Sequence, residues 1–107
     1  MFVRIVEINA KTGKGKELVR TINDQVLTLL KNQPGFVDEI VLISPDNADR
    51  GAAISFWKSR EDAEKYNRET FPKVNELMRN SLEGAPQVRT FDVVTSTAHK
   101  IVGAKAA

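Results

Sequence analysis

Residues 54–66 read ISFWKSREDAEKY and contain the only tryptophan and the only tyrosine of the chain. The β-branched and aromatic residues up to Trp57 are typical of a strand. Ser59 follows at the position of a helix N-cap, and Asp62 occupies the place of a capping-box acid. Charged residues then lead to Tyr66 at helical spacing. The stretch therefore predicts a strand that passes directly into a helix.

The rest of the chain supplies the other elements of one small domain. Pro34-Gly35 ends a helix whose apolar residues recur at helical spacing. Pro72 should kink or restart the helix that begins after Ser59. The predicted elements, in chain order, are a strand at 2–8, a helix at 15–32, strands at 36–43 and 52–57, a helix from 60 to about 83 and a strand at 88–95. This βαββαβ order is the split arrangement of ferredoxin-like domains, an α+β class with an antiparallel four-stranded sheet.

The predicted strands carry apolar side chains on both faces. A sheet with one face on helices and one in water should alternate apolar with polar residues. In strand 2–8, Val3 and Ile5 share one face with Glu7. On the other face of this strand, Phe2, Val6 and Ile8 lie with Arg4. In strand 36–43, Val41 and Ile43 lie on the face of Glu39, and Phe36, Ile40 and Leu42 lie on the face of Asp38. Two helices can cover only one face, so the other needs a partner, and a second copy of the chain is the simplest one.

Composition excludes several classes of protein. The chain has 107 residues, 41% of them hydrophobic and 28% charged, as expected for one globular domain. A net charge of +2, with acidic and basic residues interspersed, does not favour a nucleic-acid partner. The absence of cysteine excludes disulfides, thiolate catalysis and cysteine-bound metals. No segment is apolar for the roughly 18 residues of a membrane span, so we expect no membrane association and a cytoplasmic location.

Three local features are similar to those of one family. Residues 34–36 read PGF at the start of the second strand, Trp57 closes the third strand, and residues 59–66 read SREDAEKY, a small N-cap followed by an acidic helix start. With these features the chain resembles the antibiotic biosynthesis monooxygenase domain family, of the dimeric α+β barrel superfamily, from residue 2 to about residue 95. The resemblance implies one such domain at 1–97, assembled as a homodimer. The small residues that follow predict a flexible C-terminal tail at 98–107.

The resemblance implies an oxidoreductase, a cofactor-independent monooxygenase acting on a small aromatic, a quinol or a polyketide-type phenol. The anion of such a substrate itself supplies the electron to oxygen, so no metal, flavin or other cofactor is expected. In this interpretation Tyr66 and Asn67 are catalytic, because they project from one turn of the second helix toward the sheet and can donate hydrogen bonds to an anion. Trp57, Phe71 and Asn75 bind the substrate.

Haem degradation, another activity found within the family, fits these residues less well. The members of that branch resemble one another in placing an iron-ligating histidine on the second helix. This chain has Asn75 or Glu76 at that position, and neither is a credible haem ligand. The only histidine, His99, follows the fourth strand.

Two other functions remain open. A cavity beside Tyr66 could bind a small molecule without turnover. Alternatively, side chains of the dimer could fill this space, so that the protein holds no ligand. Trp57 is also explained as a core residue. The charges on the strands are also explained as ion pairs of the barrel or sheet edge: Arg4, Asp38, Glu39 and Asp92. A ligand-sized cavity between the sheet and the second helix, with Tyr66 and Asn67 pointing into it, would favour the first two hypotheses over the third.

Overall fold

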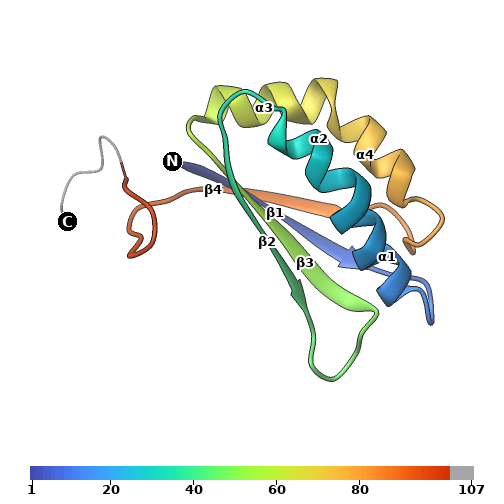
Figure 1. The fold of residues 1–107 in the computed structure, drawn as a ribbon. Coiled ribbons are helices and arrows are strands. Elements are labelled where there is room, and N and C mark those ends of the chain that lie inside the picture. The colour runs from blue at the N-terminus through green and yellow to red at the C-terminus, as the bar shows by residue number, and fades with distance from the viewer. Residues whose placement is uncertain (102–107) are drawn as a thin grey trace.

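The computed structural model describes residues 1–101 and shows one layer of helices on a four-stranded sheet (Figure 1). The strands are β1 (Phe2–Asn9), β2 (Phe36–Ile43), β3 (Arg50–Trp57) and β4 (Gln87–Asp92). The first helix consists of α1 (Gly15–Thr21), a π-helical segment η1 (Ile22–Val26) and α2 (Leu27–Lys31), and the second of α3 (Arg60–Glu69) and α4 (Phe71–Met78). Within residues 1–101, no helix is both long enough and apolar enough to cross a membrane.

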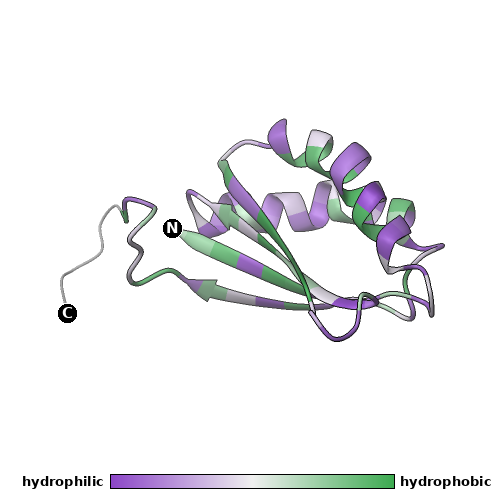
Figure 2. Ribbon diagram, turned by 60° about the horizontal axis from the view of Figure 1, so that its bottom comes forward, coloured by the Kyte–Doolittle hydropathy of each residue, from purple (hydrophilic) through white to green (hydrophobic). Residues whose placement is uncertain are grey.

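The sheet is antiparallel and has the strand order β2-β3-β1-β4. The central strands β3 and β1 pair from Phe2 opposite Trp57 to Asn9 opposite Arg50. The helices lie together on one side of the sheet, and hydrophobic residues, drawn green, recur along the strands (Figure 2). This is the ferredoxin-like α+β fold that the order of elements predicts.

The corner after Trp57 forms as the sequence predicts. The hydroxyl of Ser59 accepts a hydrogen bond of 3.2 Å from the backbone N–H of Asp62. It also donates one of 3.0 Å to the Asp62 carboxylate, so the cap and the acid hold each other. The second helix is interrupted at Thr70, and Pro72 lies in the first turn of α4, where a missing N–H breaks no helical hydrogen bond. The proline therefore restarts the helix.

One strand-face assignment from the sequence is wrong. The register between β2 and β3 shifts between Phe36 and Asp38, so β2 carries one extra residue there, as in a β-bulge. Phe36 consequently faces the helices, where its ring packs edge-on against Trp57 at a centroid distance of 5.7 Å. Simple alternation had placed Phe36 with Ile40 and Leu42, which lie on the opposite face.

The hydrophobic core fills the space between the helices and the sheet face that they cover. Trp57, at the end of β3, is completely buried and lies within it. The other buried members of this core are Phe2, Val6, Ile8, Ala10, Leu18, Ile22, Val26, Leu30, Ala63, Tyr66, Val74, Met78 and Leu82. Apart from Ala10 and Leu82, which form an isolated bridge, these residues come from both helices and from the two central strands, so burial of the helix-covered face holds the layers together.

The opposite face of the sheet, here called the outer face, carries no helix. Three of its large apolar side chains are exposed: Ile40 to 40%, Leu42 to 48% and Phe91 to 51%. By register, Val3, Ile5, Ile54 and Phe56 share this face. An apolar surface of this kind on one chain marks an interaction site.

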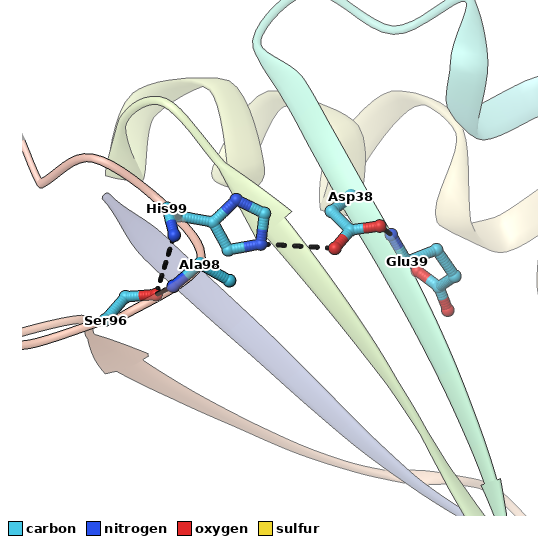
Figure 3. A network of polar contacts seen from close by, with 5 residues as sticks. All are labelled: Asp38, Glu39, Ser96, Ala98 and His99. Carbon is cyan, nitrogen blue, oxygen red and sulfur yellow. Dashed lines mark hydrogen bonds and ion pairs between the residues drawn. The ribbon is translucent and has the colours of Figure 1, made fainter.

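Beyond β4 the chain contacts the outer face (Figure 3). The ring of His99 lies 5.1 Å from that of Phe56, and its Nε2 atom is 3.2 Å from Oδ2 of Asp38. The backbone N–H of His99 donates a hydrogen bond of 2.9 Å to the hydroxyl of Ser96. In the tail predicted at 98–107, the second residue, His99, thus packs on the sheet, while residues 102–107 lie outside the described part of the chain.

Candidate functional site

A cavity of about 30 Å³ lies between the helix-covered face of the sheet and the helices. Its lining is apolar except for Arg4, Glu39, Ser55 and Tyr66, and the apolar members are Val6, Ile8, Ile22, Val26, Leu30, Ala53, Phe71, Val74 and Met78. A cavity of this size accommodates a water molecule, whereas an aromatic ring needs more space. It is therefore smaller than the ligand-sized cavity that the sequence hypothesis requires.

The π-helical segment η1 forms part of the cavity wall. Ile22 and Val26, the residues at its two ends, are buried and both line the cavity. A π-bulge widens a helix by one residue per turn and occurs frequently at functional sites. The first helix is thus least regular at the point where it faces the cavity.

A row of four polar side chains crosses the helix-covered face of the sheet. Glu39 on β2 pairs with Ser55 on β3, Ser55 pairs with Arg4 on β1, and Arg4 pairs with Thr90 on β4. Residues in register on antiparallel strands lie side by side on one face. Glu39, Ser55 and Arg4 form the polar floor of the cavity, whereas Thr90, at the sheet edge, is exposed and does not line it.

Arg4 is the centre of the polar cluster. Its side chain is only 3% exposed, and its guanidinium lies 4.6 Å from the ring centroid of Phe71 and 5.0 Å from that of Tyr66. Its Nη2 atom donates a hydrogen bond of 2.9 Å to Oδ1 of Asn67. Burial lowers the pKa of Arg4, while the neighbouring Tyr66 and Glu39 raise it. Because an arginine keeps its proton in proteins, the cavity contains a fixed cation.

Tyr66 lies above this cation as a buried hydrogen-bond donor. It is 3% exposed, and its ring packs 4.9 Å from that of Trp57 and 6.1 Å from that of Phe71. Burial raises the pKa of Tyr66 to about 12, although the nearby Arg4 lowers it. The phenol therefore keeps its proton at neutral pH and can donate it in a hydrogen bond, as expected from the sequence.

Glu39 brings a carboxyl group to the same cavity. Its Oε2 atom is buried and has no hydrogen-bond partner among residues 1–101. Burial raises the pKa of Glu39 to about 8, with Arg4 lowering it and Asp38 raising it further. A carboxyl with this pKa is mostly neutral at pH 7 and changes its charge slightly above it.

The structure brings together some of the sequence-predicted site residues. Tyr66 and Phe71 line the cavity, and Asn67, whose own side chain is exposed, contacts the cluster through Arg4. Trp57 lies behind Tyr66 and donates a hydrogen bond of 2.9 Å from Nε1 to the hydroxyl of Ser55. Asn75 does not line this cavity; it lies beside Arg79 in two other pockets, of about 360 and 340 Å³.

Arg4 and Glu39 were missed as site residues because strand charges usually form edge ion pairs. Neither makes a salt bridge within residues 1–101; Asp38, in contrast, pairs with His99 on the outer face. The sequence contained a signal for both. Arg4 alternates with Phe2, Val6 and Ile8, and Glu39 alternates with Val41, so each charge interrupts an otherwise apolar face.

The fold and the cavity define a ferredoxin-like α+β domain with a charged cluster under its helices. Residues 1–71 match the family model described as antibiotic biosynthesis monooxygenase, and the chain belongs to this family. No curated protein matches the chain.

Solved structures of similar proteins share the fold at low sequence identity. A Nitrosomonas europaea protein named for the antibiotic biosynthesis monooxygenases is 18% identical, with a TM-score of 0.74 over 89% of this chain and 100% of its own. ActVA-Orf6, a monooxygenase of Streptomyces coelicolor in complex with nanaomycin D, is 17% identical, with a TM-score of 0.74 over 89% of this chain and 88% of its own. A variant of MhuD with two manganese protoporphyrin IX molecules per active site is 21% identical, with a TM-score of 0.75 over 91% of this chain and 98% of its own.

Proposed function

We propose that the protein is a cofactor-independent monooxygenase that oxygenates a phenol or quinol bound between the sheet and the second helix. The observation that carries this function is the buried guanidinium of Arg4, held between an asparagine and two aromatic rings in an apolar cavity. Burying a charge is costly unless it is paired and hydrogen-bonded, and Arg4 makes no salt bridge within residues 1–101. Strongly perturbed groups in a cavity are typical of functional sites. A cation beside a phenol donor suits the binding of an anion.

The reaction needs only this anion and molecular oxygen. A phenolate conjugated with a ring methylene gives one electron to O₂, and the substrate radical then combines with superoxide to form a peroxide anion, which a proton converts to the hydroperoxide. Loss of water breaks the O–O bond and leaves a carbonyl, so the net change is Ar₂CH₂ + O₂ → Ar₂C=O + H₂O. The protein contributes by stabilising the phenolate and excluding water.

Each site residue has a distinct part in this proposal. Arg4 neutralises the phenolate, and Tyr66 donates a hydrogen bond to the same oxygen. Asn67 fixes the guanidinium from outside the cavity, and Phe71 provides an aromatic wall. Trp57 supports Tyr66 from behind, and Asn75 has no part because it lies outside the cavity.

Substrate binding requires the cavity to expand. The described cavity accommodates water and not an aromatic ring, so Phe71, which is partly exposed, or the wall at η1 must move as the ligand enters. The ActVA-Orf6 structure contains nanaomycin D, and the MhuD structure contains manganese protoporphyrin IX. These ligands support a small, ring-containing substrate for this protein.

A homodimer is part of the proposal. The exposed apolar side chains Ile40, Leu42 and Phe91 lie on the outer face, away from the cavity. A second copy placed with its own outer face against them would bury these side chains in a symmetric interface. Each protomer would keep a separate cavity under its helices.

Oxygen consumption by purified apoprotein tests the function. With an anthrone-like phenol and no added flavin, metal or haem, we expect oxygen uptake faster than in buffer. Tyr66→Phe keeps the ring and removes the hydroxyl, so turnover should fall by about a hundredfold or more while the melting curve stays nearly unchanged. If the variant turns over at the wild-type rate, Tyr66 is only a core residue. If no phenol in a broad panel is oxidised but some bind, the protein is a binding module.

A further inference from the structure

Glu39 is the second charged side chain of the cavity, and the oxygenation described above gives it no role. It lies on the polar row, separated from Arg4 by Ser55 alone, and it lines the same cavity as Tyr66. Its Oε2 atom is buried and lacks a hydrogen-bond partner among the described residues 1–101. In a folded protein a buried carboxylate oxygen is normally satisfied, so this one has its hydrogen-bonding capacity free for a ligand.

We propose that Glu39 is the general base of the reaction and accepts the phenolic proton of the substrate. This assignment rests on the proposed function. The substrate hydroxyl would lie between the free Oε2 atom and the guanidinium of Arg4, within reach of the Tyr66 hydroxyl. Glu39 would thereby be a catalytic residue, in direct contact with the reacting oxygen.

The charges of the cavity favour this proton transfer. In the molecules whose Glu39 is ionised, a fraction that grows as the pH approaches 8, the cavity holds a guanidinium and a carboxylate before the step and a guanidinium, a phenolate and a neutral carboxyl after it. The phenolic O–H bond breaks and a carboxyl O–H bond forms, so the net charge of the cavity does not change. Moving a negative charge from Glu39 to the phenolate avoids creating a new charge in an apolar site, which would be costly.

The proton on Glu39 has a destination later in the cycle. The substrate radical and superoxide combine as a peroxide anion, which needs one proton to become the hydroperoxide that loses water. A neutral Glu39 carboxyl beside the reacting carbon can supply it, and this returns the residue to its carboxylate form. One group then serves as base and as acid, with all protons accounted for.

The environment of Glu39 suits a base for phenols. Two titratable groups face it, Arg4 from β1 and Tyr66 from α3, and the charge of Asp38, the preceding residue of β2, acts on it from the opposite face of the sheet. Burial raises the pKa of Glu39 to about 8, and Arg4 opposes this rise. A phenol has a pKa of about 10, so this carboxylate is a much better matched base than one in water.

The pH dependence of oxygen uptake with two phenols of different acidity tests the assignment. In the wild type, the rate should rise with pH around one midpoint, near 8 and the same for both substrates, because Glu39 sets it. In Glu39→Gln the rate should fall by about a hundredfold or more at neutral pH. The remaining activity should then follow the acidity of each phenol, with two different midpoints.

Two further variants make the test decisive. Glu39→Asp keeps a carboxylate and should retain a single midpoint for both phenols at a reduced rate, which also covers the case that Glu39→Gln does not fold. Glu61→Gln, an exposed acid in the first turn of α3, should behave as the wild type.

The outcomes separate this assignment from the proposed function. Glu39 is not the base if the wild-type midpoint already moves with the substrate, or if Glu39→Gln keeps the wild-type rate and profile; oxygenation itself would then stand. If the wild-type protein oxidises no phenol, the proposed function fails and the assignment of Glu39 fails with it.

Discussion

The guanidinium of Arg4 donates a hydrogen bond of 2.9 Å to the side-chain oxygen of Asn67, 63 residues further along the chain. This contact ties the central strand β1 to α3 and joins a buried cation to an exposed amide. The amide accepts from one of the five N–H donors of the guanidinium. Asn67, although its own amide is neutral, thus orients the charged guanidinium of Arg4.

Removal of this amide should therefore affect both folding and turnover. We expect Asn67→Ala to lower the free energy of unfolding by about 1–3 kcal/mol, because a buried charged donor loses its partner. Turnover of a phenol should fall by up to about a hundredfold as Arg4 loses its position. Urea melts and oxygen uptake measure the two effects. Arg68→Ala, at the exposed neighbouring position, is the matched control, and equal behaviour of the two variants would contradict the positioning role.

Protein stability should depend on pH through Glu39. The pKa of this carboxyl is about 8 in the folded protein and near its ordinary value of 4.5 in the unfolded chain. Between these values the folded protein keeps a proton that the unfolded chain has released, so stability should fall as pH rises from about 5 to 8. Each unit of pKa difference corresponds to about 1.4 kcal/mol. Urea melts across this range measure the slope, and Glu39→Gln should reduce it. An unchanged slope in that variant would show that Glu39 ionises normally.

Trp57 should act mainly through packing. It is completely buried, packs against Phe36 and Tyr66, and donates its indole N–H to Ser55. We expect Trp57→Ala to destabilise the protein by about 3–5 kcal/mol. Denaturant melts measure the loss. A variant as stable as the wild type would exclude the structural role and favour a role of Trp57 in substrate binding.

The exposed apolar side chains of the outer face should be buried by a second copy. Light scattering at micromolar concentration should report about twice the chain mass of 11.9 kDa. Leu42→Lys places a charge in this interface and should shift the protein toward the monomer. Thr28→Lys, on the exposed side of the first helix, should leave the mass unchanged. A wild-type monomer that binds no apolar dye would refute the dimer.

Haem should not bind through a histidine in the cavity. The only histidine, His99, packs on the outer face against Phe56, across the sheet from the cavity. Asn75, near the position of the family's haem ligand, lines the molecular surface. We therefore expect no saturable one-to-one Soret shift on titration with haemin. A stoichiometric shift that a substitution on α3 or α4 abolishes would contradict this expectation.

The sequence alone determined those features that depend on residues a few positions apart. Ser59 and Asp62 identified the helix start because a cap and its acid interact within one turn, and Pro72 identified the break because its ring cannot continue a helix. The order of elements and the family followed from such local signals. Tyr66 was found by helical spacing, which places it on the side of α3 that faces the sheet.

Only the tertiary structure decided which distant residues meet. Arg4 and Glu39 lie in one row because three strands pair in a particular register, and a bulge in β2 turns Phe36 to the helices. Register is a property of paired strands, so neither strand contains it alone. The volume of the cavity depends likewise on how side chains from both helices and the sheet pack against one another, and spacing along the chain does not encode it. The polar cluster is therefore a tertiary feature: the sequence shows its charged residues, and only the fold shows which residues they contact.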